Sequence, residues 1–168
     1  MKIKQIIYKT LVFGALGATS GLALSAGTAS TTFAVTSNVA SSCTITALPV
    51  SFGSYVPTSA TDTTATGSVS VTCTKNASVS VALNAGTGTG ATETARTMSL
   101  ASNTAMTYGL YADSGYATNW GTTAGAQTTT GTGLATPVTL TVYGKITKNQ
   151  YLVGVGSYAD SITATVTY

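Results

Sequence analysis

The sequence predicts an all-β domain, on three observations. Apolar and polar residues alternate in many short runs after the first 30 residues, and no stretch keeps a helical period. Segments rich in Gly, Thr and Ser separate these runs, as turns separate strands. The chain has 168 residues, which leaves room for one domain behind an N-terminal leader. We therefore expect several short strands packed into a single domain.

The first 29 residues have the pattern of a secretory signal peptide. Lys2, Lys4 and Lys9 precede a broken apolar stretch over residues 11–24, and small residues follow it. With roughly 14 apolar residues, the stretch is shorter than the ~20 that a membrane span needs. We expect residues 1–29 to be removed by cleavage near 26–29, after Ala26 or Ala29, and the protein to be exported.

Charge and residue types argue against several functions. The net charge of +3 comes from the leader lysines, because four later cations balance four carboxylates. Nucleic-acid binding needs clustered cations, so we expect no nucleic-acid partner. The chain has no His, and the carboxylates stand far apart, as solvated loop charges do. We expect no enzymatic activity, no metal site and no cofactor.

The runs that predict strands begin close behind the leader. They cover residues 33–39, 43–47, 69–73, 79–83, 106–112, 138–142 and 162–168. Segments 85–94 and 121–133 predict loops. Cys43 and Cys73 are the only cysteines, and export favours a disulfide between them, worth ~3.5 kcal/mol in the chain-entropy model. Many short strands with one disulfide favour a Greek-key β-sandwich of immunoglobulin type over a barrel.

The two end runs are the candidates for function. The last run reaches Tyr168, and we expect it to form an edge strand with unpaired backbone groups. In the first run, Phe33, Val35, Ser37 and Val39 share one face. Residues 33–39 are either an ordinary first strand or a strand that is given to a neighbouring subunit.

Five features carry a resemblance to a known family. They are Phe33-x-Val35…Val39, Cys43-Thr44-Ile45, the segment Phe52–Pro57, Cys73 and the terminal run Tyr158–Tyr168. In this order they resemble the spore coat protein U domain family, which includes the major subunits of archaic chaperone–usher pili. The resemblance extends over nearly all of the chain after the leader.

The resemblance implies an incomplete immunoglobulin-like sandwich of six strands that is completed by donor-strand exchange. A periplasmic chaperone first lends the missing strand, and an outer-membrane usher exchanges it for the N-terminal strand of the next copy. Residues 30–41 would then be the donor segment and residues 42–168 the domain. The implied donor residues are Phe33, Val35, Ser37 and Val39, and the implied acceptor residues are Ile162, Ala164, Val166 and Tyr168. Ser37 departs from the expected apolar type.

These expectations lead to one main function and two alternatives. The main one is a pilin-like subunit that polymerises head-to-tail with copies of itself into a cell-surface fibre for adhesion and biofilm formation. The second is a secreted spore-coat or matrix protein without an ordered fibre. The third is a carbohydrate-binding module that uses Trp120 and the tyrosines.

Overall fold

The structure is a computed structural model that describes residues 26–100, 104–123 and 125–168. It divides into two units, Met1–Ser37 and Asn38–Tyr168, which we describe separately. In the first unit, residues 26–37 form no strand, and all of them are exposed. Most of the predicted signal peptide, residues 1–25, lies outside the described residues.

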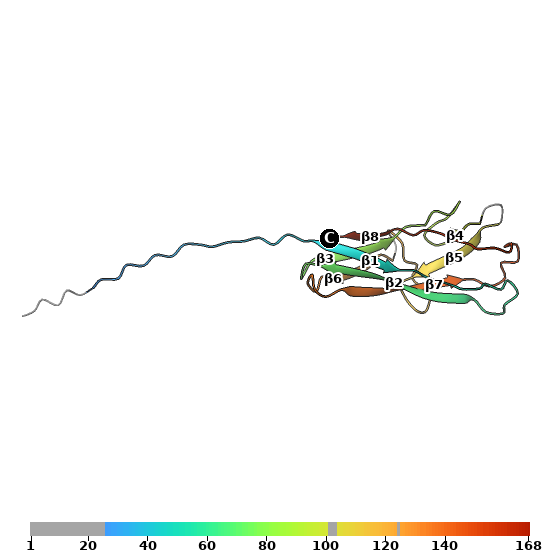
Figure 1. Cartoon of the computed structure of the whole chain (residues 1–168), viewed down its shortest axis with the longest axis horizontal. Helices are drawn as coiled ribbons and strands as arrows, with labels where there is room; N and C mark the ends of the chain where they lie inside the picture. Colours follow the sequence, from blue (N-terminus) through green and yellow to red (C-terminus); the bar gives the residue numbers. More distant parts are fainter. Residues whose placement is uncertain (1–25, 101–103, 124) are drawn as a thin grey trace, which may run out of the picture. The chain divides into compact units, whose positions relative to one another are not determined.

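The second unit is built from strands, as predicted (Figure 1). Its described residues form eight: β1 Cys43–Leu48, β2 Thr63–Cys73, β3 Ser78–Leu83, β4 Arg96–Met98, β5 Met106–Tyr111, β6 Gln127–Thr130, β7 Val138–Ile146 and β8 Ala164–Thr167. The described part of the chain contains no helix that is long and apolar enough to cross a membrane.

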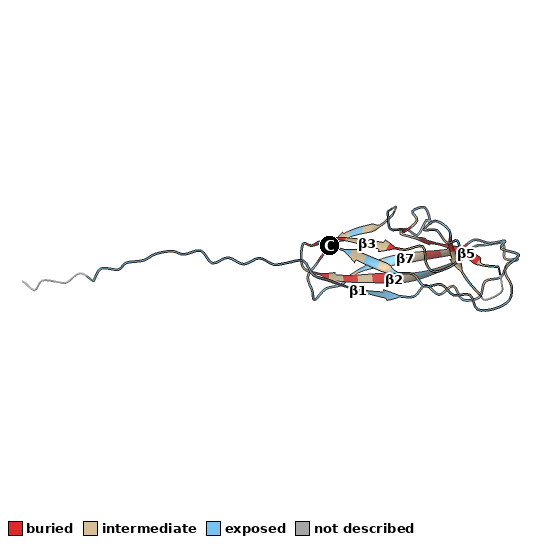
Figure 2. Ribbon diagram, turned by 90° about the horizontal axis from the view of Figure 1, so that it is seen from above, coloured by how far each residue is buried: buried red, intermediate tan, exposed pale blue. Residues whose placement is uncertain are grey.

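The strands form two antiparallel sheets around one core. The first sheet has the order β1-β2-β7-β5-β4, and the second has the order β6-β3-β8. Alternation explains which side chains are buried: Val79, Val81 and Leu83 of β3 point inward between exposed or half-buried neighbours. They join Val71 of β2 and Val142 of β7 in the same cluster. Figure 2 shows the buried stretches of the strands in red. This arrangement is the predicted β-sandwich.

Three local predictions differ from the structure. Residues 33–39 form no strand and pair with no strand of the described structure. β6 lies inside the predicted loop 121–133. All four β6 residues are polar, so alternation gave no signal, and β6 joins the sheet by pairing with β3. Together with the three-residue β4, β6 raises the number of strands from the implied six to the eight described.

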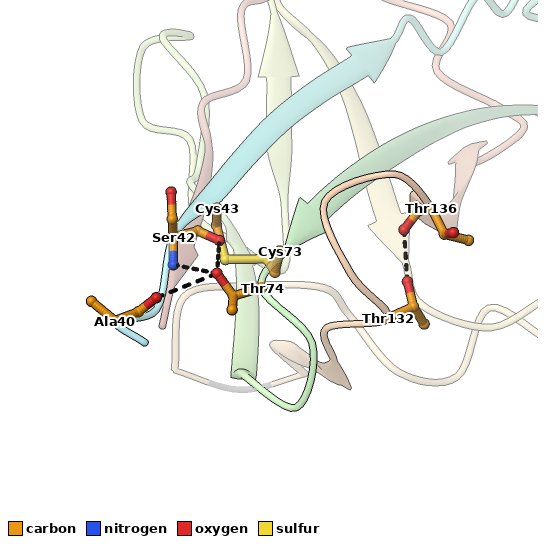
Figure 3. Close-up of a disulfide and its surroundings, with 7 residues drawn as sticks. All are labelled: Ala40, Ser42, Cys43, Cys73, Thr74, Thr132 and Thr136. Carbon is orange, nitrogen blue, oxygen red and sulfur yellow. Dashed lines mark hydrogen bonds between the residues drawn. A yellow bond between two sulfur atoms is a disulfide. The ribbon is translucent and has the colours of Figure 1, made fainter. Parts of the chain in front are cut away.

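The predicted disulfide is confirmed. Cys43 of β1 and Cys73 of β2 face each other in the strand ladder and are bonded, with Cα atoms 4.1 Å apart (Figure 3). Thr74 continues the contact beyond the disulfide. Its backbone N–H donates to the carbonyl oxygen of Ser42 at 2.9 Å, and its hydroxyl oxygen accepts from the N–H of Ser42 at 3.0 Å. The start of β1 is therefore held firmly against the end of β2.

Two large polar side chains are buried in the core. The Trp120 ring is fully buried, and its Nε1–H donates to the carbonyl oxygen of Val81 at 2.9 Å. The Arg96 guanidinium is also fully buried and donates to several backbone carbonyls, among them that of Trp120 at 2.7 Å. A buried indole has no face to offer a sugar. The prediction of a carbohydrate platform at Trp120 is therefore wrong.

Candidate functional site

Two sheet edges lie next to each other without pairing. β1 is an outer strand of the five-stranded sheet, and β8 is an outer strand of the three-stranded sheet. Residues of β1 and β8 are in contact, but no strand ladder joins these two strands within the described part of the chain. They run in opposite directions in Figure 1. The sandwich is therefore open along this side.

On β8, the backbone groups that face the opening follow from the pairing on its other side. The N–H of Asn84 donates to the carbonyl oxygen of Thr163 at 3.1 Å, just before β8 pairs with β3. Backbone groups alternate in direction along an antiparallel strand. Thr163 and Thr165 therefore face β3, whereas Ala164 and Val166 turn their N–H and C=O groups toward the opening.

The same reasoning applies to β1. Because the N–H of Thr74 bonds to the carbonyl oxygen of Ser42, Ser42 and Thr44 face β2. The backbone groups of Ile45 and Ala47 then face the opening. Both borders thus offer free donors and acceptors to an additional strand.

The predicted acceptor residues mostly occupy this border. Ile162, Ala164 and Val166 are half-buried and pack against the core, whereas Thr163 and Thr165 between them are exposed. Tyr168 is different, because 56% of its surface is exposed. The first three residues therefore combine an inward side chain with a backbone that faces the opening.

An apolar cavity of about 520 Å³ lies beneath the opening. Ile162 and Ala164 form part of its wall on the β8 side. The opposite wall comes from the end of β1 and the segment behind it, and the floor comes from the core: Leu48, Val50, Phe52, Val69, Leu83, Leu110 and Val142. We call the opening and this cavity the acceptor groove.

One carboxylate stands at the edge of the acceptor groove. Asp160 Oδ2 accepts from the Tyr108 hydroxyl at 2.7 Å, and Oδ1 accepts from the N–H of Thr87 at 2.7 Å. Burial raises the pKa of Asp160, but the hydrogen bonds from Tyr108 and Thr87 outweigh burial, so the pKa lies below its ordinary value. Burial and the same hydrogen bond raise the pKa of Tyr108. Asp160 therefore ties β5, the 84–90 loop and the approach to β8 together as a carboxylate.

A second cavity, of about 610 Å³, lies next to the acceptor groove. Val50, Phe52, Met98 and Tyr158 line both cavities. The second cavity extends to the loops behind β7, where Val153 and Val155 are among its lining residues. The hollow surface therefore continues beyond the end of the groove, with a more polar lining.

The predicted donor residues are exposed. The exposed fractions are 84% for Phe33, 85% for Val35 and 78% for Val39, and Ser37 is exposed as well. Phe33, Val35 and Ser37 belong to the first unit, and Val39 belongs to the second. No strand includes them, so their backbone groups make no sheet ladder in the described structure.

Sequence reasoning missed the β1 wall and the polar edge of the groove. Leu48, Val50 and Phe52 lie beyond the alternating run of β1, and only the motif around Phe52 drew attention to this segment. Asp160 was interpreted as a solvated loop charge, and the structure shows it half-buried and hydrogen-bonded instead. Nothing in the sequence links it to Tyr108, which lies 52 residues away.

Comparison with solved structures supports the fold. A similar chain occurs in the crystal structure of the CsuC–CsuE chaperone–tip adhesion subunit pre-assembly complex from archaic chaperone–usher Csu pili of Acinetobacter baumannii. The TM-score is 0.56 and the sequence identity 21%; the match covers 77% of this chain but only 40% of that one. At this identity the likeness concerns the fold alone.

Comparison with sequences establishes the family. A search of curated proteins found no matching relative. Residues 29–165, however, match the Spore Coat Protein U domain, and this match includes the whole predicted donor segment, residues 30–41. The match extends over most of the 168 residues. The chain therefore belongs to the Spore Coat Protein U domain family.

Proposed function

We propose that this protein is a structural subunit of a chaperone–usher pilus that polymerises by donor-strand complementation. Residues 33–39 of one copy would fill the acceptor groove of another copy. One observation carries the proposal: two neighbouring sheet edges are unpaired above an apolar cavity, in a chain that also has an exposed alternating segment. The family match and the likeness to a chain from a pilus chaperone–subunit complex agree with it.

The donor segment fits the groove in length and character. Residues 33–39 and 162–168 both contain seven residues, or about 20 Å of strand. Phe33, Val35 and Val39 would enter on the face that meets the cavity. Burying three such side chains stabilises the joint by roughly 5–9 kcal/mol before backbone hydrogen bonds are added. Ser37 would leave one shallow or hydrated position.

The backbone supplies the remaining specificity. A strand between β1 and β8 would take up the open N–H and C=O groups of Ala164 and Val166, as in other complexes formed by strand addition. Each copy would donate at one end and accept along its side. Such a contact is heterologous, and it produces an open fibre.

The proposal includes partners and a route to the cell surface. A periplasmic chaperone would cover the acceptor groove before assembly, because an unpaired edge above an apolar cavity invites non-specific association. An outer-membrane usher would then catalyse the exchange of strands. The assembled fibre would support adhesion and biofilm formation at the cell surface.

Deleting residues 30–40 tests the proposal. The deletion removes the donor strand and leaves β1, the disulfide and the acceptor groove in place. We expect electron microscopy of expressing cells to show no fibres, while a chaperone-bound monomer is still recovered from the periplasm. Normal fibres from the deletion variant would refute the proposal.

The family's name supports a second candidate, a coat or matrix protein that uses the same fold without an ordered fibre. The two candidates differ in morphology. Amorphous surface material that depends on residues 30–40 would favour the coat protein, and uniform filaments would favour the pilus.

A further inference from the structure

The exposed apolar side chains of the second unit gather at its two ends. At one end lie Val39, Leu134 and Tyr168; we call this end the disulfide pole. Leu134 lies near the disulfide because the N–H of its neighbour Gly133 donates to the carbonyl oxygen of Cys73 at 3.1 Å, and the C-terminus, Tyr168, lies beside the start of β1 in Figure 1. At the other lie Val56, Tyr151, Leu152 and Val155, near the end of β7; we call it the opposite pole. Leu48, at the edge of the acceptor groove, is the only other large hydrophobic residue that is highly exposed in the described part of this unit.

The flank of the five-stranded sheet has a different surface. Its outward residues include Thr64 and Thr66 on β2 and Thr139 and Thr141 on β7, and all four are exposed. A soluble domain that keeps apolar side chains off its flank but exposes them at its ends is suited to contacts at those ends.

The opposite pole is continuous with the acceptor groove. The second cavity is lined by Val153, Val155 and Tyr158, and Tyr158 also lines the groove. The Tyr55 hydroxyl donates to the carbonyl oxygen of Thr147 at 3.1 Å, which ties the segment behind β1 to the loop behind β7. An occupant of the groove that emerges at this end would meet the opposite pole directly.

The donor segment has a short connection to its own domain. Only three residues, Ala40, Ser41 and Ser42, separate Val39 from Cys43. The Cα atoms of Val39 and Cys43 are therefore at most about 14 Å apart. The Thr74 hydroxyl, which contacts the carbonyl oxygens of Ala40 at 3.5 Å and Ser42 at 3.3 Å, restrains this connection further (Figure 3). A copy whose strand fills a groove must hold its disulfide pole close to the end of that groove.

The acceptor groove has two ends, and the direction of the fibre determines which of them lies next to the disulfide pole of the incoming copy. Each copy's own connection leaves from the disulfide pole, because Ala40 and Ser42 are bonded to Thr74 there. In a head-to-tail fibre with one repeated contact, the incoming copy occupies the other pole. The disulfide pole of the incoming copy would then face Tyr151–Val155.

We propose that successive copies make a second contact, in which the Tyr151–Val155 loop at the opposite pole of one copy packs against the disulfide pole of the next, around Leu134. The inference rests on the proposed function and adds an interface outside the acceptor groove. It gives the exposed Leu152 and Val155, with exposed fractions of 82% and 102%, an apolar partner in the fibre. The contact would limit bending at each joint.

Cysteine cross-linking in assembled, full-length protein tests the contact. Two variants place one new thiol at each pole: Leu134→Cys with Val155→Cys, and Leu134→Cys with Leu152→Cys. A matched control combines Leu134→Cys with Thr141→Cys, on the exposed sheet flank. After oxidation and boiling without reductant, we expect a ladder of covalent multimers from at least one pole-to-pole variant and none from the control. Equal ladders from all three variants, or no ladder from either pole-to-pole variant while fibres are present, would overturn the contact.

A second variant covers the case in which the cysteine variants fail to assemble. In Leu152→Ser with Val155→Ser, the donor segment and the groove are intact, so we expect fibres with a persistence length at least twofold shorter than normal in electron micrographs. An unchanged persistence length would overturn the second contact and leave the proposed function standing. An unsubstituted chain that forms no fibres would overturn both.

Discussion

The two ends of the described chain have similar sequences and different structures. Residues 33–39 and residues 162–168 both alternate apolar and polar side chains over seven positions. The first run forms no strand, and its apolar side chains are exposed. The second contains β8, which pairs with β3 from Leu83↔Ala164 to Ser80↔Thr167 and half-buries its apolar side chains. Alternation sets which face is apolar, but a strand forms only where the run pairs with another strand.

The comparison also shows what each end lacks. β8 has a partner on one side and open backbone groups on the other, whereas residues 33–39 have no strand partner in the described structure. If residues 33–39 of one copy pair with β8 of another copy, these residues gain a strand partner and the open side of β8 is closed in the same contact.

The largest effect is expected from a charge on the inward face of the donor run. Val35→Asp would place a carboxylate in an apolar groove, where an unpaired charge is strongly unfavourable. We expect assembly to be lost, as measured by electron microscopy and by the fraction of protein in multimers. The matched control is Thr36→Asp, on the outward face of the same run, which should assemble normally. If the two variants behave alike, residues 33–39 do not enter a groove with the inferred face inward.

Removing the disulfide should weaken the domain that carries the acceptor groove. Cys43→Ala with Cys73→Ala releases the loop between β1 and β2, which costs about 3.5 kcal/mol in the chain-entropy model. The free energy of unfolding in urea should fall by about that amount. A loss below about 1 kcal/mol would mean that the ladder between β1 and β2 holds the start of β1 without the bond.

The hydrogen bond at the edge of the groove should contribute less. Tyr108→Phe removes the hydroxyl that donates to Asp160, and hydrogen bonds to charged groups contribute roughly 1.5–3 kcal/mol. Tyr151→Phe is a matched control, because the Tyr151 hydroxyl bonds only to exposed Asn149 and the change should be close to neutral. If both variants lower the free energy of unfolding in urea by the same small amount, the hydrogen bond from Tyr108 to Asp160 does not stabilise the fold.

The smallest effect is expected from protonation of Asp160 in acid. The folded pKa of Asp160 is lowered, so its contribution to stability is present above the ordinary pKa of an aspartate and is lost as the pH falls through the folded value. Thermal unfolding of the unsubstituted protein should therefore shift downward in acid, and Asp160→Asn should reduce that shift. Asp160→Asn should not abolish the downward shift in acid, because the pKa values of Glu93 and Asp113 are also lowered by hydrogen bonds. An identical shift in both proteins would contradict this role of Asp160.

Much of the sandwich could be predicted because its strands alternate clearly. β1, β2, β3 and β7 each contain a predicted run, β5 covers all but the last residue of another, and the cysteine pair is bonded as expected. β4 and β6 could not be predicted, because they are short and mostly polar, and β6 also depends on pairing with β3, which is distant in sequence.

The site was predictable only in part for the same reason. Alternation shows that Ile162, Ala164 and Val166 share a face, but it does not show which side of β8 remains unpaired. The position of Asp160 between Tyr108 and Thr87 depends on contacts across three separate segments. A single sequence carries no local signal for such contacts.

The most direct test is an electron cryo-microscopy structure of the assembled protein. We expect residues 33–39 of a second copy to lie between β1 and β8, with Phe33, Val35 and Val39 pointing into the acceptor groove and the backbone paired with Ala164 and Val166. A groove filled by the chain's own residues 33–39, or left empty between associated copies, would contradict it.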